Sequence, residues 1–385
     1  MDPSKQYDVI VVGVGSMGAA ACYYLSKRGY KVLGLEQFTT PHDRGSHGGQ
    51  SRIIRKAYFE HVDYIPLLQR AYENWKTIEM ESGEIIFHRT GLYYAGPKGH
   101  SLLESVKNSA VQYQIPLEIL DSQSSSSRFP LIRIPPEYEA LFEPDAGLLT
   151  PETAIRTYVK EARNKGAEIL ENVTVRSWKK MGESVQVVTD WGTFSSAKII
   201  FTAGSWTGKL LPDLSAQLTV TRQVLAWFEP KTPPLFFQDT FPSWLIAEDG
   251  DPGAYYGFPI LRNPIAGGPS GFKIAYHFPG KATSVEEVDR SVHEEDIKPL
   301  RDRVHRYFPD AAGPILETKT CLYTMSSDEH FIVDHLPGFE EVACVACGFS
   351  GHGFKFVAAI GEILSDLATQ GNTSLPIHFL RATRF

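Results

Sequence analysis

The feature that most constrains the fold of this chain is a glycine-rich turn close to its beginning. Residues Tyr7 to Val12 form a short run rich in β-branched side chains, which predicts a buried parallel strand. Gly13, Gly15 and Gly18 follow at once in the spacing Gly-x-Gly-x-x-Gly. A helical pattern comes next, and then a second short strand that ends at Glu36. This order of strand, glycine turn, helix, strand and acid is typical of a dinucleotide-binding βαβ unit.

The positions of this motif each have a physical role. The first two glycines permit a tight turn and let a pyrophosphate approach the helix N-terminus, and the third lets helix and strand pack closely. Glu36 is placed to accept hydrogen bonds from the ribose hydroxyls of adenosine. Because no basic residue stands beside Glu36, an unphosphorylated ribose is expected, which favours FAD or NAD over NADP. The alternative interpretation is a glycine-rich turn of an α/β protein that binds no nucleotide.

Composition limits the class of protein and its partners. A chain of 385 residues predicts two lobes rather than one. With 45 acidic and 38 basic residues the formal net charge is -7, which argues against a nucleic-acid partner. No apolar run reaches the roughly 18 residues that a membrane-spanning helix needs, so no membrane partner is expected. The first residues leave no room for a signal peptide, and the last ones lack a Ser-Lys-Leu peroxisomal address.

The four cysteines are too few for a disulfide scaffold and suit a reducing compartment, so a cytoplasmic location is expected. Cys344 and Cys347 lie in an apolar strand without a second cysteine pair. Because the sequence has no zinc-type spacing, we expect these two side chains to pack in a core, and we expect no metal site.

A glycine-rich polar segment between Pro41 and Tyr58 carries two arginines. Arg52 and Arg55 are three residues apart and would share one face of a helix. Arginines in such a pattern often lie on a solvated helix face. The glycines before them, and the apolar Ile53 and Ile54 between them, favour burial against a ligand instead.

Residues 218 to 317 are rich in short strands and aromatic side chains. In the strand from Gly271 to His277, Lys273 and His277 point to one face, while large apolar side chains point to the other. The face with Lys273 and His277 is either exposed to solvent or the wall of a polar pocket, and both interpretations are open.

The region from Thr318 to Lys355 joins reactive side chains to a second glycine-rich turn. A lone cysteine, Cys321, stands shortly before Tyr323. The later segment Gly-Phe-Ser-Gly-His-Gly-Phe-Lys carries His352 and Lys355, and its glycines let the backbone approach a large flat ligand.

Several motifs together give the chain a close resemblance to the monomeric sarcosine oxidase family, which includes N-methyltryptophan and pipecolate oxidases, among the D-amino-acid-oxidase-like flavoproteins. The resemblance spans nearly the whole chain. Its carriers are the opening Gly-x-Gly-x-x-Gly with Glu36, Gly-Ser-His with Ser-Arg-Ile-Ile-Arg, Tyr-Tyr-Gly-Phe-Pro, Lys-Ile-Ala-Tyr-His, Thr-Cys-Leu-Tyr-Thr with Asp-Glu-His-Phe-Ile-Val-Asp, and Gly-Phe-Ser-Gly-His-Gly-Phe-Lys.

The resemblance implies an α/β (α+β) fold of two lobes. One is a Rossmann-like FAD-binding lobe assembled from residues 1–85, 146–217 and 318–385. The other is a substrate lobe built on an antiparallel sheet, from residues 86–145 and 218–317.

The activity that the resemblance implies is that of an FAD-dependent oxidase of secondary, N-methyl amino acids such as sarcosine. A hydride equivalent passes from the C–N unit to flavin, the electrons pass to O2 to give H2O2, and water hydrolyses the imine. Sarcosine would give glycine and formaldehyde. Cys321 stands where the family attaches FAD covalently through a thioether, a reaction that needs a thiolate. The cofactor-binding positions implied beside the glycine motif and Glu36 are Ser46, Val175 and His352.

The family's substrate and catalytic positions fall on residues far apart in this chain. Arg55 and Lys355 stand where the family binds the substrate carboxylate, which suits the planar fork of arginine. Lys273 stands at the oxygen-activating position, where a fixed positive charge would stabilise superoxide. The other substrate-binding positions are Tyr256 and Gly351, and the other catalytic positions are Arg52, His277 and Tyr323.

One departure from the family's pattern bears on the substrate. Sarcosine oxidases often read Gly-Ser-His-His-Gly-Asp-Thr-Arg, whereas this chain reads Gly-Ser-His-Gly-Gly-Gln-Ser-Arg and continues as pipecolate-type members do. Sarcosine, N-methyltryptophan and a cyclic amine such as pipecolate or proline all fit the cationic clamp. A flavin dehydrogenase that uses another electron acceptor is a further alternative. The partners expected are a small secondary amino acid and O2, and the chain is expected to be a monomer.

Overall fold

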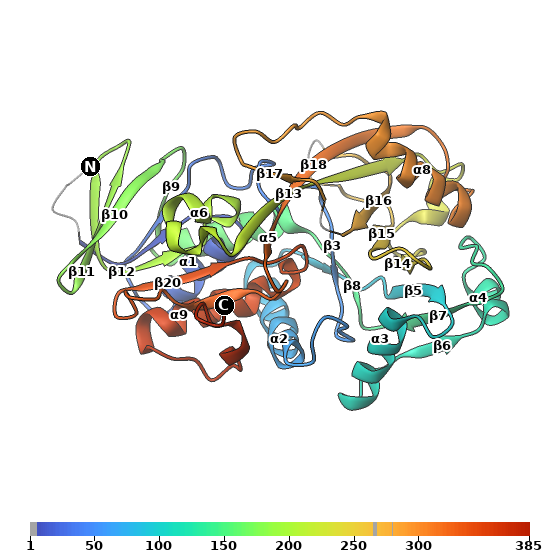
Figure 1. The fold of residues 1–385 in the computed structure, drawn as a ribbon, viewed down its shortest axis with the longest axis horizontal. Helices are drawn as coiled ribbons and strands as arrows, with labels where there is room; N and C mark the ends of the chain where they lie inside the picture. The colour runs from blue at the N-terminus through green and yellow to red at the C-terminus, as the bar shows by residue number, and fades with distance from the viewer. Residues whose placement is uncertain (1–5, 265–267, 279) are drawn as a thin grey trace.

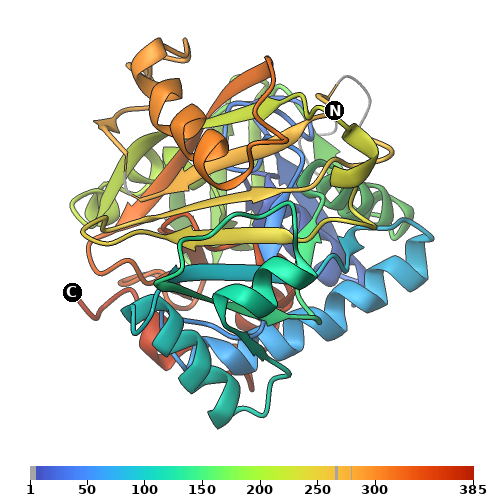
Figure 2. The same ribbon diagram turned by 90° about the vertical axis from the view of Figure 1, so that its right-hand side faces the viewer.

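Two large sheets and one small sheet carry the strands of the protein. The computed structural model describes residues 6–264, 268–278 and 280–385. The eight-stranded sheet lies towards one end of the molecule and the nine-stranded sheet towards the other (Figures 1 and 2). The α/β (α+β) class with a second, antiparallel sheet, which the sequence predicts, is confirmed.

The eight-stranded sheet is built around the N-terminal strand, β1 (Gln6–Val12). Along its main path the order is β10-β11-β12-β1-β2-β9, and β20 pairs with both β12 and β19. β1 runs parallel to its neighbours β2 and β12, which confirms the predicted βαβ unit. The bounds are β2 (Val32–Leu35), β9 (Glu168–Leu170), β10 (Val175–Met181), β11 (Ser184–Thr189), β12 (Thr193–Phe201), β19 (Ile332–His335) and β20 (Ala343–Cys347).

Alternate side chains of β1 enter two separate cores. Val9 and Val11 pack in the core that also contains the apolar faces of four helices. Ile10 and Val12 pack on the opposite face of the sheet, with side chains of β2, β11 and β12. Because both faces of this central strand are buried, its sequence is a continuous apolar run and does not alternate between apolar and polar residues. The four helices are α1 (Ser16–Lys27), α2 (Tyr64–Ser82), α5 (Pro151–Asn164) and α9 (Val357–Gln370).

The nine-stranded sheet has the order β17-β13-β16-β15-β14-β5-β7-β6, with β18 paired to β13. Its neighbouring strands are antiparallel except for β14 and β5, which are parallel. The bounds are β5 (Leu92–Pro97), β6 (Glu118–Leu120), β7 (Tyr138–Glu143), β13 (Leu218–Phe228), β14 (Ser243–Ala247), β15 (Ala254–Phe258), β16 (Phe272–His277), β17 (Ala282–Thr283) and β18 (Ile315–Ser326).

The two faces of β16 decide between the interpretations left open for Lys273 and His277. Phe272 and Ile274 pack in a core beneath α8 (Glu294–Tyr307). Ala275 belongs to the opposite core, which also contains Cys321. The face that carries Lys273 and His277 therefore points into the molecule.

The small sheet corrects one prediction. Arg52 begins the strand β3 (Arg52–Ile54), which pairs with β8 (Gly147–Leu149), and β8 also pairs with β4 (Phe87–His88). Arg52 and Arg55 therefore do not share the face of a helix. The pairing with β8 forms across more than ninety residues of sequence, and the β-branched Ile53 and Ile54 suit a strand better than a helix.

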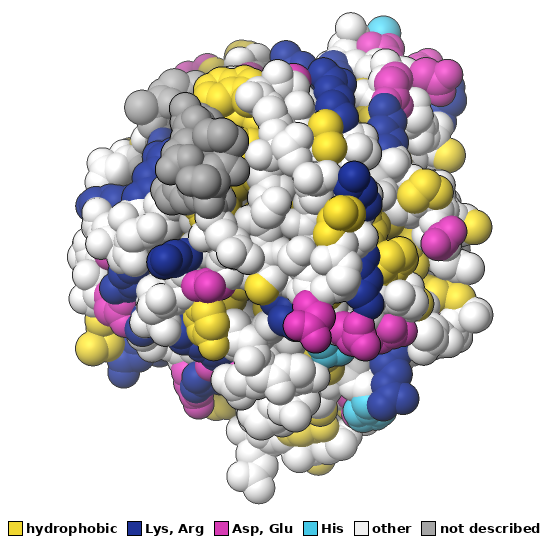
Figure 3. All heavy atoms as spheres, turned by 90° about the vertical axis from the view of Figure 1, so that its left-hand side faces the viewer, with side chains coloured by type: hydrophobic (Ala, Val, Ile, Leu, Met, Phe, Trp, Pro, Cys, Tyr) yellow, Lys and Arg dark blue, Asp and Glu magenta, His cyan; other side chains and the backbone are white. Residues whose placement is uncertain are grey.

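The remaining longer helices are α3 (Ser101–Gln112) and α4 (Ser122–Arg128). In the part of the chain that the structure describes, no helix combines the length and apolar character needed to cross a membrane. Over the same residues, no group of three or more His, Cys, Asp or Glu side chains is arranged to hold a metal ion. Figure 3 shows basic and acidic side chains interspersed on the face at the left of Figure 1.

The division of the chain into two lobes stays a prediction. The proposed boundary at residue 318 falls inside β18, a strand of the nine-stranded sheet. Residues 318 to 326 thus pair with the antiparallel sheet, although the next strand along the chain, β19, belongs to the eight-stranded sheet.

Candidate functional site

A cleft of about 440 Å³ opens at the carboxyl ends of the parallel strands. Open α/β sheets bind their ligands at this edge. The strands β1, β2, β12 and β20 each end at the cleft, through Val12, Leu35, Thr202 and Ala346 respectively.

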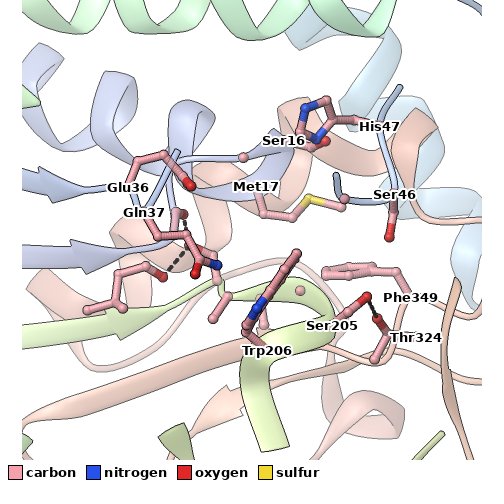
Figure 4. A pocket seen from close by; sticks show the side chains of 18 of the residues that line it. Ser16, Met17, Glu36, Gln37, Ser46, His47, Ser205, Trp206, Thr324 and Phe349 are labelled. Carbon is pink, nitrogen blue, oxygen red and sulfur yellow. Dashed lines mark hydrogen bonds between the residues drawn. The ribbon is translucent and has the colours of Figure 1, made fainter. Parts of the chain in front are cut away.

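The cleft extends from the acid after β2 to the second glycine-rich turn (Figure 4). Glu36 and Gln37 stand at one end, Ser46 and Phe349 stand at the other, and the Trp206 ring projects between them. A cleft of this shape suits an elongated ligand with a ribose at one end and a flat ring at the other.

The three glycines of the N-terminal motif have different roles. A Cβ at Gly13, whose φ is +89°, would lie 2.7 Å from the Thr202 carbonyl oxygen. A Cβ at Gly18 would lie 1.9 Å from the Gly13 carbonyl oxygen, so this glycine permits the packing of α1 on β1, as predicted. A Cβ at Gly15 would meet no atom closer than His47 Nδ1 at 3.8 Å. Gly15 therefore leaves space at the N-terminus of α1, where free N–H groups attract an anion.

Glu36 is buried and braces the glycine turn. Its Oε2 accepts a hydrogen bond from Val14 N at 2.8 Å, and its Oε1 accepts one from Phe38 N at 3.0 Å. Burial raises the pKa of Glu36, while the backbone donors oppose this rise. Because each carboxylate oxygen accepts more than one hydrogen bond, the same group can brace the turn and accept ribose hydroxyls.

A second cavity, of about 50 Å³, adjoins the far end of the cleft. Arg52, Gly351 and Phe354 line both spaces, so the two share a wall. Arg52 holds the chain around this junction, because its guanidinium donates to the carbonyl oxygens of Ser46 at 2.6 Å, Gly48 at 2.7 Å and Ser51 at 2.8 Å.

Two buried cations line the second cavity. The Arg55 guanidinium donates to both carboxylate oxygens of Glu60, at 2.7 and 2.8 Å. Lys355 Nζ donates to the His352 carbonyl oxygen at 2.7 Å. Burial and then Arg55 lower the pKa of Lys355 to about 7. Burial raises the pKa of Glu60, but Arg55, together with His352 and Lys355, outweighs this and lowers it to about 2. Two cations thus share one anion.

The two histidines of the second cavity are neutral near pH 7. Burial lowers the pKa of His277 to about 4 and that of His352 to about 3. His277 Nδ1 lies 3.3 Å from the Tyr323 hydroxyl. His352 Nε2 donates to the Glu329 carbonyl oxygen at 3.0 Å, which leaves its Nδ1 to accept from the Tyr58 hydroxyl.

The structure brings most of the predicted site residues together. Those in the wall of the cleft are Gly13, Gly15, Glu36, Ser46, Arg52, Val175, Tyr323 and Gly351. Those in the wall of the second cavity are Arg52, Arg55, Tyr256, His277, Gly351, His352 and Lys355. Gly18, Lys273 and Cys321 line neither space.

Lys273 and Cys321 are buried, and the charge of Arg52, which lines both spaces, acts on both of them. Lys273 is 1% exposed and donates to Gly49 O, Ser51 O and Ser51 Oγ at 2.6, 3.1 and 3.2 Å. Cys321 is 2% exposed on β18. Burial raises the pKa of its thiol, and the nearby Arg52 and Lys273 only partly offset this rise.

Sequence reasoning missed several residues of these walls. Met17, Gln37, His47 and Phe349 line the cleft, and Glu60 and Phe59 line the second cavity. Gln37 and Phe349 are direct neighbours of motif residues and could have been found by position. Nothing in the sequence marks Glu60, because its importance comes from its contact with Arg55.

The fold and the cleft define a dinucleotide-binding protein of the α/β class. Comparison with known proteins makes this more specific. Residues 8–367 match the family model described as FAD dependent oxidoreductase. The chain is 37% identical over 374 residues to monomeric sarcosine oxidase from Streptomyces avermitilis, covering 97% of this chain and 96% of the relative. It is 35% identical over 381 residues to N-methyl-L-tryptophan oxidase from Yersinia pestis, covering 98% and 99%.

Solved structures share the fold. NikD, an unusual amino acid oxidase essential for nikkomycin biosynthesis, superposes with a TM-score of 0.85 at 22% identity, covering 98% of both chains. Glycine oxidase from Geobacillus kaustophilus superposes with a TM-score of 0.81 at 18% identity, covering 99% of this chain and 100% of the other. The chain belongs to the FAD-dependent oxidoreductase family, and the flavin enzyme predicted from the sequence is confirmed at this level.

The residues of the cleft fit FAD. Gly15 leaves room for the pyrophosphate at the start of α1, and Glu36 lies at the end suited to the adenosine ribose. A Cβ at Gly15 would lie 3.8 Å from His47 Nδ1, and burial lowers the pKa of His47 to about 4, so the imidazole beside this space is neutral near pH 7. At the other end, the glycines at 348, 351 and 353 line the cleft without side chains that would exclude a flat ring.

Proposed function

We propose that this protein is a flavin oxidase of a small secondary amino acid, with sarcosine as the reference substrate and O2 as the electron acceptor. The second cavity carries the proposal, since Glu60 is the only acidic side chain among the described residues of its wall, and it faces the two cations Arg55 and Lys355. While Lys355 is protonated, these two buried side chains carry one positive charge more than Glu60 offsets, which is complementary to one carboxylate. The names of the relatives, a sarcosine oxidase and an N-methyl-L-tryptophan oxidase, support a zwitterionic amine as substrate.

The size of the cavity favours a small substrate. A buried water needs roughly 10–15 Å³ of such space, so about 50 Å³ suits a molecule of sarcosine size better than one with an indole ring. Phe59, Leu245 and Phe354 form an apolar part of the wall. This part favours one alternative, a cyclic secondary amino acid such as pipecolate or proline, whose ring methylenes would pack there.

The chain's own residues would bind and orient the substrate. The carboxylate competes with Glu60 for the Arg55 fork and pairs with Lys355, while Tyr256 and the Gly351 backbone confine the carbon skeleton. His277 is neutral, and its Nε2 can take a proton from the substrate ammonium, since its Nδ1 faces Tyr323. FAD, when bound, supplies the redox chemistry: it accepts a hydride equivalent from the C–N unit and transfers two electrons to O2.

The overall balance is a two-electron oxidation. The amine loses a hydride and a proton and becomes an imine, O2 gains two electrons and two protons and becomes H2O2, and water cleaves the imine to an amine and an aldehyde. For sarcosine the products are glycine and formaldehyde. We further propose that FAD is attached through Cys321 and that Lys273 supplies the positive charge for the reaction with O2.

Anaerobic mixing of the purified protein with a panel of amino acids tests this function. We expect sarcosine, other small N-methyl amino acids, pipecolate or proline to bleach the flavin absorbance, and the fastest of them identifies the preferred substrate. In air, one H2O2 should form per substrate oxidised. No bleaching by any member of the panel would refute the proposal, and bleaching with little peroxide would indicate a dehydrogenase.

Replacement of Lys273 tests the oxygen role separately. Lys273→Met is expected to leave the rate of anaerobic flavin reduction largely intact and to slow reoxidation by O2 by orders of magnitude, because the buried positive charge is lost. Stopped-flow absorbance measures both steps. Equal damage to the two steps would show that Lys273 serves the fold or the substrate instead.

A further inference from the structure

A strained turn of three residues lies under Lys273. Ser51 N donates to the Gly49 carbonyl oxygen at 2.9 Å, and the residue between them, Gln50, has a φ of +66°. This combination is the pattern of the classic γ-turn, which is rare and strained. Gly49 has a φ of +102°, and a Cβ there would lie 2.4 Å from a Leu225 methyl carbon. Strain of this kind persists only where the surroundings hold it.

Two side chains of opposite charge hold this turn. Glu152 Oε1 accepts from Gly49 N at 2.9 Å and from Gln50 N at 3.0 Å. Lys273 Nζ donates to Gly49 O, Ser51 O and Ser51 Oγ. Three acceptors match the three N–H groups of an ammonium, whereas a neutral amine has only two. The Phe258 and Trp227 rings, with centroids 4.9 and 5.4 Å from Nζ, also favour a cation.

Several groups near Lys273 shift its pKa, and Glu152 is the carboxylate among them. Burial lowers the pKa of Lys273 most, and Arg52 and Lys319 lower it further. Glu152 and Cys321 act in the opposite direction. Cys321 is held as a thiol by its own burial, so the carboxylate of Glu152 is the negative charge that opposes these effects.

The carboxylate of Glu152 is more than a brace for two N–H groups. A neutral amide oxygen could accept both hydrogen bonds, and the second oxygen, Oε2, is buried and has no partner among the described residues. The same holds for Gln50 Nε2. An unpaired buried oxygen is costly. Lys273 lies on the other side of the same turn. Attraction to its ammonium gives a reason for a charged carboxylate, and not a neutral amide, at position 152.

We propose that Glu152 is a positioning residue for Lys273: it holds the turn Gly49–Ser51 from one side, and this fixes the three acceptors that face the Lys273 ammonium on the other side. The consequence for turnover rests on the proposed function of Lys273 in the reaction with O2. Glu152 touches neither the substrate cavity nor the cleft.

The kinetic test uses Glu152→Gln, which keeps the shape and removes the charge. Reoxidation of the reduced holoenzyme by O2, followed by stopped flow, should have a pH profile that lies about one unit lower, so on the alkaline limb of the profile the rate at a given pH should be about tenfold lower. Anaerobic reduction should change far less. Glu161→Gln on the same helix is the matched control and should behave as wild type. Glu152→Asp restores the charge and should bring the profile back.

The second test measures stability and does not depend on turnover. The pKa of Lys273 is lower in the folded protein than in the unfolded chain. At pH values between these two, Lys273 is protonated in the unfolded chain and neutral in the folded protein, so the free energy of unfolding rises with pH. Removing the charge of Glu152 lowers the pKa of Lys273 in the folded protein further. The free energy of unfolding should therefore begin to rise at a lower pH in Glu152→Gln than in the wild type, as measured by urea unfolding of the holoprotein. In the Lys273→Met background, Glu152→Gln should not alter the pH dependence.

The outcomes separate the two proposals. An unchanged pH dependence in Glu152→Gln, or the same change with and without Lys273, would overturn the positioning role. If the unfolding results are as expected but neither Lys273→Met nor Glu152→Gln slows reoxidation, Glu152 does position Lys273, and the oxygen role of Lys273 is wrong.

Discussion

At the scale of single residues, the site depends on charges held out of water. Lys355 and Arg55 are each at least nine-tenths buried and share one wall, with Glu60 as their anion. Such groups are costly to bury unless they are paired. A bound carboxylate would complete the pairing, so we expect the cavity to bind anions with an affinity that depends on pH through Lys355.

The affinity for a simple carboxylate should therefore fall as pH rises through about 7. The pKa of Lys355 is about 7, so its charge is present below that pH and lost above it. His277 and His352, with pKa values of about 4 and 3, stay neutral across this range, and Glu60 stays ionised. The Kd of propionate, measured from the flavin spectrum, should increase up to about tenfold per pH unit above this value. A pH-independent Kd would contradict the assignment, and Lys355→Gln should bind weakly with a flat profile.

Replacement of Cys321 tests the proposed covalent link between this side chain and FAD. In Cys321→Ala, acid precipitation should release the yellow flavin into the supernatant, whereas in the wild type it should stay with the pellet. Cys347→Ala, another buried cysteine, is the control and should keep the flavin bound. Flavin that stays with precipitated Cys321→Ala would place the link elsewhere.

At the scale of elements, the junction of β1 and α1 was predictable because its signals are local. The spacing of the three glycines and the apolar run before them lie within one short segment. The strand β3 was not predictable, because its three residues gain their conformation from β8, far along the chain. Short strands with distant partners carry too few residues for a periodic pattern.

Two glycine substitutions should separate binding from folding at this junction. Gly18→Ala puts a Cβ 1.9 Å from the Gly13 carbonyl oxygen, and it should destabilise the protein by about 1–3 kcal/mol through overpacking. Gly15→Ala clashes with no protein atom and should leave the apoprotein folded but unable to hold the pyrophosphate. Urea unfolding and flavin content measure the two effects. Equal losses of stability would show that Gly15 is also required for packing.

At the scale of the whole molecule, the cleft joins the two large sheets. Tyr323 and Thr324 come from β18 of the nine-stranded sheet, while most of the wall comes from the eight-stranded sheet. The Thr324 and Ser205 hydroxyls, 2.9 Å apart, connect the two sides (Figure 4). A ligand in the cleft therefore contacts both sheets and should stabilise their association.

Binding of FAD should accordingly raise the thermal stability of the chain. In Cys321→Ala, free FAD at a hundred times its Kd should add about 2.7 kcal/mol to the free energy of unfolding. Differential scanning calorimetry should show Tm increasing with FAD concentration in this variant, and no such dependence in fully flavinylated wild type. A Tm independent of FAD in both proteins would mean that the cofactor does not join the sheets.

The sequence by itself determined the dinucleotide unit, the class of fold and the residue types at the site, because these follow from local spacing and from motifs. The tertiary structure alone decided which charges meet. The placement of Arg55, Glu60 and Lys355 in the wall of one cavity, and of Lys273 and Glu152 on two sides of one turn, depends on burial and on contacts between distant segments. Electrostatic energies are set by distance and by exclusion of water, and neither quantity is encoded in any single stretch of the chain.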